Sequence, residues 1–155
     1  MMTRVHTLMM LTTLLAFVGC QPAPRNLTRP GEALRPCPST PNCVSTEAAD
    51  RRHAIPSIPF GGTPEQAQAH ARQALLAEPR TRVTLEAPGY LRAEARSRLF
   101  RFVDDVEVVV DGPARVIRFR SASRVGRGDM GVNRARMERF AARFRALDDP
   151  PEVSR

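Results

Sequence analysis

Three glycines near the end of the chain have the spacing of a dinucleotide-binding loop. They are Gly126, Gly128 and Gly131 in the stretch GRGDMG. Glycines at this spacing let a backbone approach a pyrophosphate closely and direct the amides of a helix N-terminus at its charge. A dinucleotide fold also needs a further parallel strand that ends in an acidic residue about twenty residues onward. The sequence offers one helix after Gly131 and no strand after it, so we predict a turn and no nucleotide.

Carboxylates and serines could support catalysis, but their placement does not favour it. Asp104 and Asp105 are neighbours in a predicted strand, where consecutive side chains point to opposite faces, so they cannot flank one bond together. Asp105 and Glu107 share a face, but each is expected opposite an Arg, which lowers the pKa of a carboxyl group. The candidate nucleophiles and bases are Ser97, Ser121, Ser123, His53 and His70. None of these three serines lies near a histidine in the sequence, so we expect no catalytic residues.

The first nineteen residues have the layout of a secretory signal peptide. Arg4 precedes an uncharged apolar stretch from Leu8 to Val18, and this stretch is too short for a comfortable membrane span. Gly19 and Cys20 resemble the lipobox of bacterial lipoproteins, although Phe17 stands where that pattern usually has Leu. The resemblance implies that residues 1–19 are removed and that Cys20 is acylated, which would anchor the protein to a membrane. An uncleaved anchor and an ordinary secreted protein are the alternatives.

Two further cysteines, Cys37 and Cys43 in CPSTPNC, form an even pair that fits an oxidising compartment. A disulfide here would close a small loop and stabilise the fold by about 2 kcal/mol. Zinc is the rival interpretation, but two more ligands would have to come from His53 and His70, and the spacing is not that of a structural zinc site. We therefore expect a disulfide and no metal or other cofactor.

The formal charge of +8 comes from 24 basic residues, all of them Arg. A basic chain can bind nucleic acid, but these Arg are spread along the sequence, and one Tyr with no Trp leaves little for base stacking. We expect no nucleic-acid partner. Residues 20–35 are rich in Pro and Arg with few apolar side chains, which is the composition of a tether that holds a domain off a membrane.

The rest of the chain predicts two helices and about four strands. Thr63, Pro64 and Gln66 supply a capping box and a first-turn proline for a helix over 64–76. Alternating segments predict strands over 82–87, 90–97, 103–110 and 115–123, and a helix over 133–147 has Asn133 as its expected N-cap. This order predicts an α+β fold, an antiparallel sheet of about four strands with two helices packed on one face and its charged face open.

The hairpin around DGPA has a register that satisfies both faces of its strands. Pairing Val110 with Arg115 places Val108 opposite Ile117 and Val106 opposite Phe119 on the buried side. On the other side this register places Glu107 opposite Arg118 and Asp105 opposite Arg120. A slip by one residue would destroy both sets.

Three ordered blocks resemble a bacterial and plastid family known as domain of unknown function 1499. The blocks are CPSTPNCVST, YLRAEARSRLFRFVDDVEV and IRFRSASRVGRGDMGVNRARM, and the resemblance extends over residues 36–147. It implies one domain over 36–148 followed by a tail over 149–155. The family has no established activity, cofactor or catalytic residue that could be transferred to this chain.

Positions within these blocks are the candidate ligand-binding residues. They are Arg96, Asp104, Asp105, Arg120, Ser121, Ser123, Arg124, Asp129, Asn133 and Arg134. One hypothesis is an anion pocket at one end of the sheet, in which Arg120, Arg124 and Arg134 supply charge and the glycines expose amides. The structural alternative, which we favour, is that the aspartates neutralise these Arg and the glycines only turn the chain.

The expected function is that of a noncatalytic lipoprotein of the cell envelope, anchored in a membrane and facing the periplasm or the cell exterior. Its Arg-rich face would bind a small anion, a lipid headgroup or an envelope protein. An enzyme of unknown reaction that uses the Asp, Arg and Ser side chains is one alternative. A purely structural or assembly role, with the apolar segment from Ile55 to Phe60 or the edge strand over 82–87 adding to a partner's sheet, is another.

Overall fold

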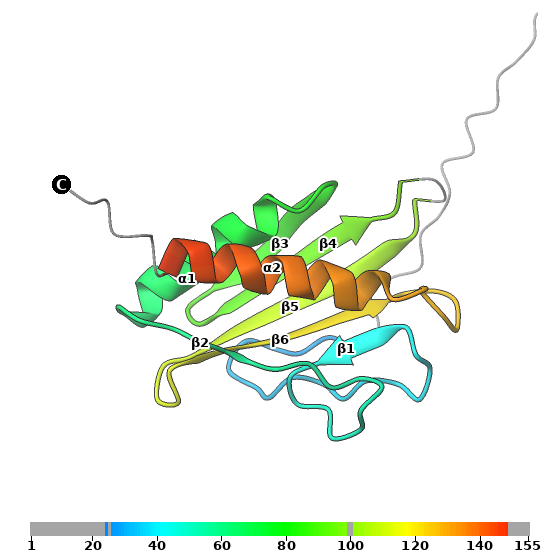
Figure 1. Cartoon of the computed structure of the whole chain (residues 1–155), viewed down its shortest axis with the longest axis horizontal. Coiled ribbons are helices and arrows are strands. Elements are labelled where there is room, and N and C mark those ends of the chain that lie inside the picture. Colours follow the sequence, from blue (N-terminus) through cyan, green and yellow to red (C-terminus); the bar gives the residue numbers. More distant parts are fainter. Residues whose placement is uncertain (1–23, 25, 99–100, 149–155) are drawn as a thin grey trace, which may run out of the picture.

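The computed structural model describes residues 24, 26–98 and 101–148, and it has the predicted α+β architecture with an antiparallel sheet (Figure 1). The sheet order is β1-β6-β5-β4-β3, and β2 also pairs with β6. The elements are β1 (Cys43–Ser45), β2 (Ile58–Pro59), α1 (Pro64–Leu76), β3 (Thr81–Ala87), β4 (Tyr90–Arg96), β5 (Val103–Asp111), β6 (Val116–Ser123) and α2 (Val132–Asp148). The described part of the chain thus has six strands where about four were expected.

Both helices cover the same face of the sheet, where they form one hydrophobic core (Figure 1). Helix α1 begins as predicted, because the Thr63 side chain accepts from the Gln66 amide and the Gln66 side chain accepts from the Thr63 amide. The buried face of α1 consists mainly of alanines such as Ala71, which let this helix pack close to the strands. The larger side chains of Phe140 and Phe144 fill the core beneath α2. None of the helices in the described ranges is long and apolar enough to cross a membrane.

The strands β1 and β2 were missed because they have too few residues to show an alternating pattern. Strand β1 pairs Cys43 with Ala122 and Ser45 with Arg120, and β2 pairs Ile58 with Ile117. Tertiary pairing with the long strand β6, and not local propensity, therefore defines both elements. Pairing through β1 also places the disulfide between Cys37 and Cys43 beside the sheet.

The register predicted for the β5–β6 hairpin is wrong by two residues. Val108 pairs with Phe119, Val110 with Ile117, and Glu107 with Arg120 instead of Arg118. Asp105 correspondingly lies opposite Ala122 and not Arg120. The last pair of the hairpin is Asp111 with Val116, and four residues connect them. The predicted last pair, Val110 with Arg115 around DGPA, lies one residue earlier on each strand. A shift of two leaves each side chain on its predicted face and changes only its partners.

The second face of the sheet is not open as predicted, because residues 26–36 cover its middle. The backbone amide of Thr28 donates to Glu107 at 2.7 Å, and the Thr28 hydroxyl accepts from the Arg35 amide. Thr28 and Leu34 are buried, and Glu107 has no exposed surface. The later half of the expected tether therefore belongs to the folded unit, because it supplies a polar cover for a buried carboxylate. The signal peptide over 1–19, the acylated Cys20 and the tail over 149–155 lie outside the described residues.

Candidate functional site

The sheet divides the candidate site residues into two groups, because adjacent positions of β5 and β6 face opposite sides. Asp104, Ser121 and Ser123 point toward α2. Asp105 and Arg120 lie on the face covered by the N-terminal segment. The expectation that these side chains meet at one site is therefore wrong, since the backbone layer of the sheet separates them.

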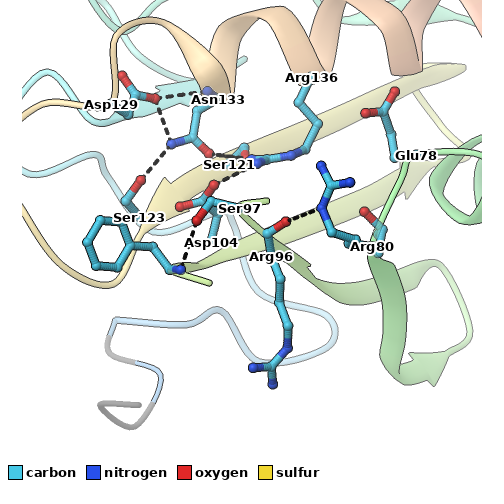
Figure 2. Close-up of polar contacts among 12 residues, drawn as sticks. Glu78, Arg80, Arg96, Ser97, Asp104, Ser121, Ser123, Asp129, Asn133 and Arg136 are labelled. Atoms are coloured by element: carbon cyan, nitrogen blue, oxygen red, sulfur yellow. Dashed lines mark hydrogen bonds and ion pairs between the residues drawn. The ribbon is translucent and has the colours of Figure 1, made fainter. Parts of the chain in front are cut away.

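The group beneath α2 forms a closed polar network around Asn133 (Figure 2). The side-chain amide of Asn133 donates to the Ser123 hydroxyl at 2.9 Å, and its oxygen accepts from Ser121 and from Arg136 at 2.8 Å. Arg136 also donates to Asp104 at 2.6 Å. Buried polar groups that satisfy one another in this way specify the position of a helix on a sheet. The network therefore holds the first turns of α2 in place.

The group on the opposite face is a chain of ion pairs centred on Arg124. Its guanidinium binds both carboxylate oxygens of Asp105, at 2.7 and 2.9 Å, and one oxygen of Glu94 at 2.6 Å. Glu94 also pairs with Arg82 at 2.7 Å and with Arg96 at 3.5 Å. The hydrogen bond to Asp105 raises the pKa of Arg124 against the effect of burial, and Glu94 raises it further. Burial would raise the pKa of Glu94, but the guanidinium groups of Arg82 and Arg124 outweigh burial and lower it.

A second buried cluster occupies the middle of this face. Glu107 accepts from the Tyr90 hydroxyl at 2.9 Å and from Arg120 at 3.1 Å, in addition to the Thr28 amide. Burial, followed by the charge of Glu107, raises the pKa of the Tyr90 phenol. Arg120 is thus neutralised by a carboxylate that has no exposed surface. Both Arg120 and Arg124 thus have carboxylate partners, as the structural alternative expects, but the partner of Arg120 is Glu107 and not an aspartate.

The GRGDMG loop turns the chain into α2 and caps the helix with Asp129. The Asp129 carboxylate accepts from the Gly131 amide at 3.1 Å and from the Asn133 amide at 2.8 Å. Gly126 and Gly131 have φ angles of 83° and 78°, which only glycine adopts without strain. The prediction that Asn133 is the N-cap is wrong, because α2 already includes Val132 and the Asn133 side chain points into the buried network. The Gly131 amide is likewise not available to a ligand.

Arg134 differs from the other two arginines of the predicted anion pocket. Its guanidinium donates to the carbonyl oxygens of Arg52 and Ala54, at 3.0 and 2.9 Å, and to no carboxylate in the described residues. It lines a surface hollow of about 320 Å³ together with the exposed Arg52. The hollow is lined by Pro41, Val44, Arg52, Gly128, Asp129, Met130, Gly131 and Arg134. Asp129 caps the helix and contributes one negative charge, which the two guanidinium groups outnumber, so the net charge of this hollow is positive.

The described residues place no general base beside a serine. His53 is buried and contacts Asp50 at 2.8 Å and the Thr40 carbonyl at 3.0 Å, which holds the loop before β2. His70 lies 3.4 Å from Asp148 at the end of α2. The serines of β6 contact Asn133 and Arg136 instead. Within the described ranges, no cluster of three or more His, Cys, Asp or Glu could hold a metal ion.

Sequence reasoning missed two buried charges, Arg136 and Glu78, that hold α2 to the rest of the fold. Arg136 binds Asp104, and Glu78 binds Arg139 at 2.9 Å and also Arg143. The available signal was the spacing of these Arg, which lie three, four and seven residues apart beside the apolar stripe of α2. Burial opposes ionisation of Glu78, but the hydrogen bonds from the two guanidinium groups outweigh burial and lower its pKa.

Comparison with known proteins identifies the family of this chain, but it does not assign an activity. Neither the curated proteins nor the solved structures give a significant match to this chain. The profile of one family, described as "Protein of unknown function (DUF1499)", matches residues 33–144. This match includes the network around Asn133, the ion pairs of Arg124 and the hollow beside Arg134, whereas Thr28 of the Glu107 cluster lies before it. The chain therefore belongs to the family of proteins of unknown function DUF1499.

Proposed function

We propose that this protein is a noncatalytic lipoprotein of the cell envelope that binds an anionic group in the hollow beside Arg134. The observation that carries the proposal is that the two guanidinium groups there have no carboxylate partner in the described residues. Arg120, Arg124 and Arg136 each bind a carboxylate, whereas Arg52 and Arg134 have none in the described part of the chain. Two such guanidinium groups at the rim of a concave surface suit a carboxylate or a phosphate, which Arg binds in a bidentate manner.

The backbone contacts of Arg134 also favour a binding role. Two carbonyl oxygens hold one end of its guanidinium, so the side chain has already lost its rotational freedom before a ligand arrives. Arg52 is exposed and can adjust to the ligand. A ligand of about the size of a phosphate monoester fits a hollow of about 320 Å³ with room for solvent. The structure gives no comparable support to an enzyme, because the carboxylates of β5 are all paired with Arg.

The assembly alternative through β3 has little support in its surface. This strand is at the edge of the sheet, as that alternative requires, but it contains an irregularity between Val83 and Leu85. It also exposes the charged side chains of Arg82 and Glu86. Bulges and charges are the features that keep edge strands from pairing with other chains. We therefore do not assign the partner-binding role to this edge.

The envelope location rests on the sequence and on the disulfide. The apolar stretch that ends in Gly19 and Cys20 has the form of a lipoprotein signal. The bond between Cys37 and Cys43 is typical of proteins outside the cytosol. Mass spectrometry of the protein purified from membranes tests this part, since acylated Cys20 as the first residue gives a mass that an uncleaved chain does not.

The binding part is tested with the mature protein in detergent by thermal unfolding and native mass spectrometry. Inorganic phosphate, glycerol 3-phosphate and citrate serve as probes of the two anion types. We expect at least one probe to raise the melting temperature of the wild type, and Arg52→Ala to abolish the increase. Arg51→Ala is the matched control, because Arg51 is also exposed but does not line the hollow. Equal stabilisation of both variants, or no stabilisation of the wild type, would reject the site.

A further inference from the structure

We propose that one end of the domain, formed by the start of β5 and the loop before α2, rests on an anionic lipid surface. This inference rests on the lipid anchor of the proposed function and does not require a ligand in the hollow beside Arg134, although Met130 also lines that hollow. The two segments emerge from adjacent strands, because the Arg124 amide donates to the Val103 carbonyl at 3.1 Å. Figure 1 shows both at the same end of the sheet, opposite the β5–β6 turn.

The chemistry of this end is apolar and basic. Three of the four large apolar side chains that are exposed in the described residues are here: Phe102, Met130 and Val132. Met130 is fully exposed and has a φ of 52°, an unfavourable conformation for a long side chain that makes no contribution to the core. Arg101 and Arg127 are exposed beside them. Apolar side chains surrounded by Arg are the composition of surfaces that enter the headgroup region of a bilayer.

Only one acidic residue of the two segments opposes this contact. The described residues from 101 to 102 and from 125 to 132 contain one acid, Asp129. Its carboxylate is occupied by the amides of Gly131 and Asn133 at the start of α2. The exposed Arg101 and Arg127 outnumber this one acid, so the net charge of this end is positive, and each Arg near an anionic membrane favours the docked state by about fivefold.

The place where the N-terminal segment enters the domain favours a membrane as the partner of this end. Asn26 lines a small hollow together with Ser123 and Arg124, so the chain enters the fold at this same end. Cys20 precedes Asn26 by six residues, which span at most about 22 Å when fully extended. The opposite end of the domain, at Ala114, is separated from the end where the chain enters by the length of β6, about 26 Å for eight residues. An acylated Cys20 therefore holds the end with Met130 near the lipid and leaves the end with Ala114 in water.

The test uses the mature lipoprotein with an environment-sensitive fluorophore at Met130→Cys, reconstituted in vesicles that contain phosphatidylglycerol. The matched control carries the same label at Ala114→Cys, which is exposed at the other end of the domain. The natural thiols do not react, because Cys20 carries lipid and Cys37 is bonded to Cys43. Both substitutions are at exposed turn positions, and circular dichroism verifies that each variant is folded.

We expect lipids with a quencher near the headgroup to quench the label at residue 130 at least about twofold more than the label at residue 114. The double substitution Arg101→Gln and Arg127→Gln reduces this difference on phosphatidylglycerol, whereas Arg52→Ala does not. Vesicles that float with the protein while both labels are quenched equally would overturn the inference and leave the anchor intact. Protein that carries no acyl chain and does not float would overturn the anchor and the inference together.

Discussion

Replacing Glu107 by Ala is the strongest perturbation that the structure predicts outside the apolar core. Glu107 has no exposed surface and is the carboxylate partner of Arg120, whose side chain is 3% exposed. The substitution leaves the guanidinium buried without a counter-charge, and it also removes the acceptor of the Thr28 amide and the Tyr90 hydroxyl. Breaking a buried pair on one side costs about 3–5 kcal/mol. We expect a loss of about 4 kcal/mol in the free energy of unfolding.

Urea denaturation at pH 7, followed by circular dichroism, measures this loss without screening the ion pair by salt. For a domain of this size the melting temperature should fall by about 15 °C. Glu86→Ala is the matched control, because Glu86 is also a strand residue paired with an Arg, but both side chains are almost half exposed. We expect the control to lose less than about 1 kcal/mol.

A double-mutant cycle separates the ion pair from the other contacts of Glu107. Adding Arg120→Ala to Glu107→Ala removes the uncompensated charge, so the double variant should be more stable than the sum of the single losses predicts, by at least about 1 kcal/mol. Losses that simply add, or equal losses for Glu107→Ala and Glu86→Ala, would refute the argument that burial of the charge pair determines the effect.

Three further predictions concern the helix α2 and the disulfide. Because its guanidinium partners lower the pKa of Glu78 in the folded state, Glu78 stabilises the fold above its usual pKa near 4.5 and loses this contribution as pH falls through the folded value. The stability difference between wild type and Glu78→Gln, measured by urea denaturation, should therefore be larger at pH 7 than at pH 3. Asp129→Ala removes the cap of α2 and should cost about 1 kcal/mol, whereas Asp129→Asn should cost less. Replacing Cys37 and Cys43 by Ser should lower the unfolding free energy by about 2 kcal/mol, and reduction of the wild type should match this loss.

The local signals in the sequence were sufficient for most of the regular elements. The capping box at Thr63 and Gln66 determines where α1 begins, since its hydrogen bonds involve only neighbouring residues. The alternation in β4 likewise determines that Leu91 and Ala93 are buried while Arg92 and Glu94 are partly exposed. Such patterns are local consequences of helix and strand geometry, so they do not depend on the rest of the fold.

The charged residues show what local patterns could not determine. The alternation of β5 placed Glu107 on the second face, but it could not show that Thr28, far away in the sequence, covers that face. Nor could it show that the hairpin shifts by two residues and pairs Glu107 with Arg120, because both registers bury the same apolar side chains.

The sequence by itself determined the two helices, the four longer strands and the two faces of the sheet, because periodicity and capping depend on neighbours in the chain. Only the tertiary structure decided which Arg are neutralised. A guanidinium group can reach carboxylates on several elements, and its partner depends on which segments cross it in space. The contrast between Arg124, bound to Asp105 and Glu94, and Arg134, bound only to carbonyl groups in the described residues, therefore required the assembled fold.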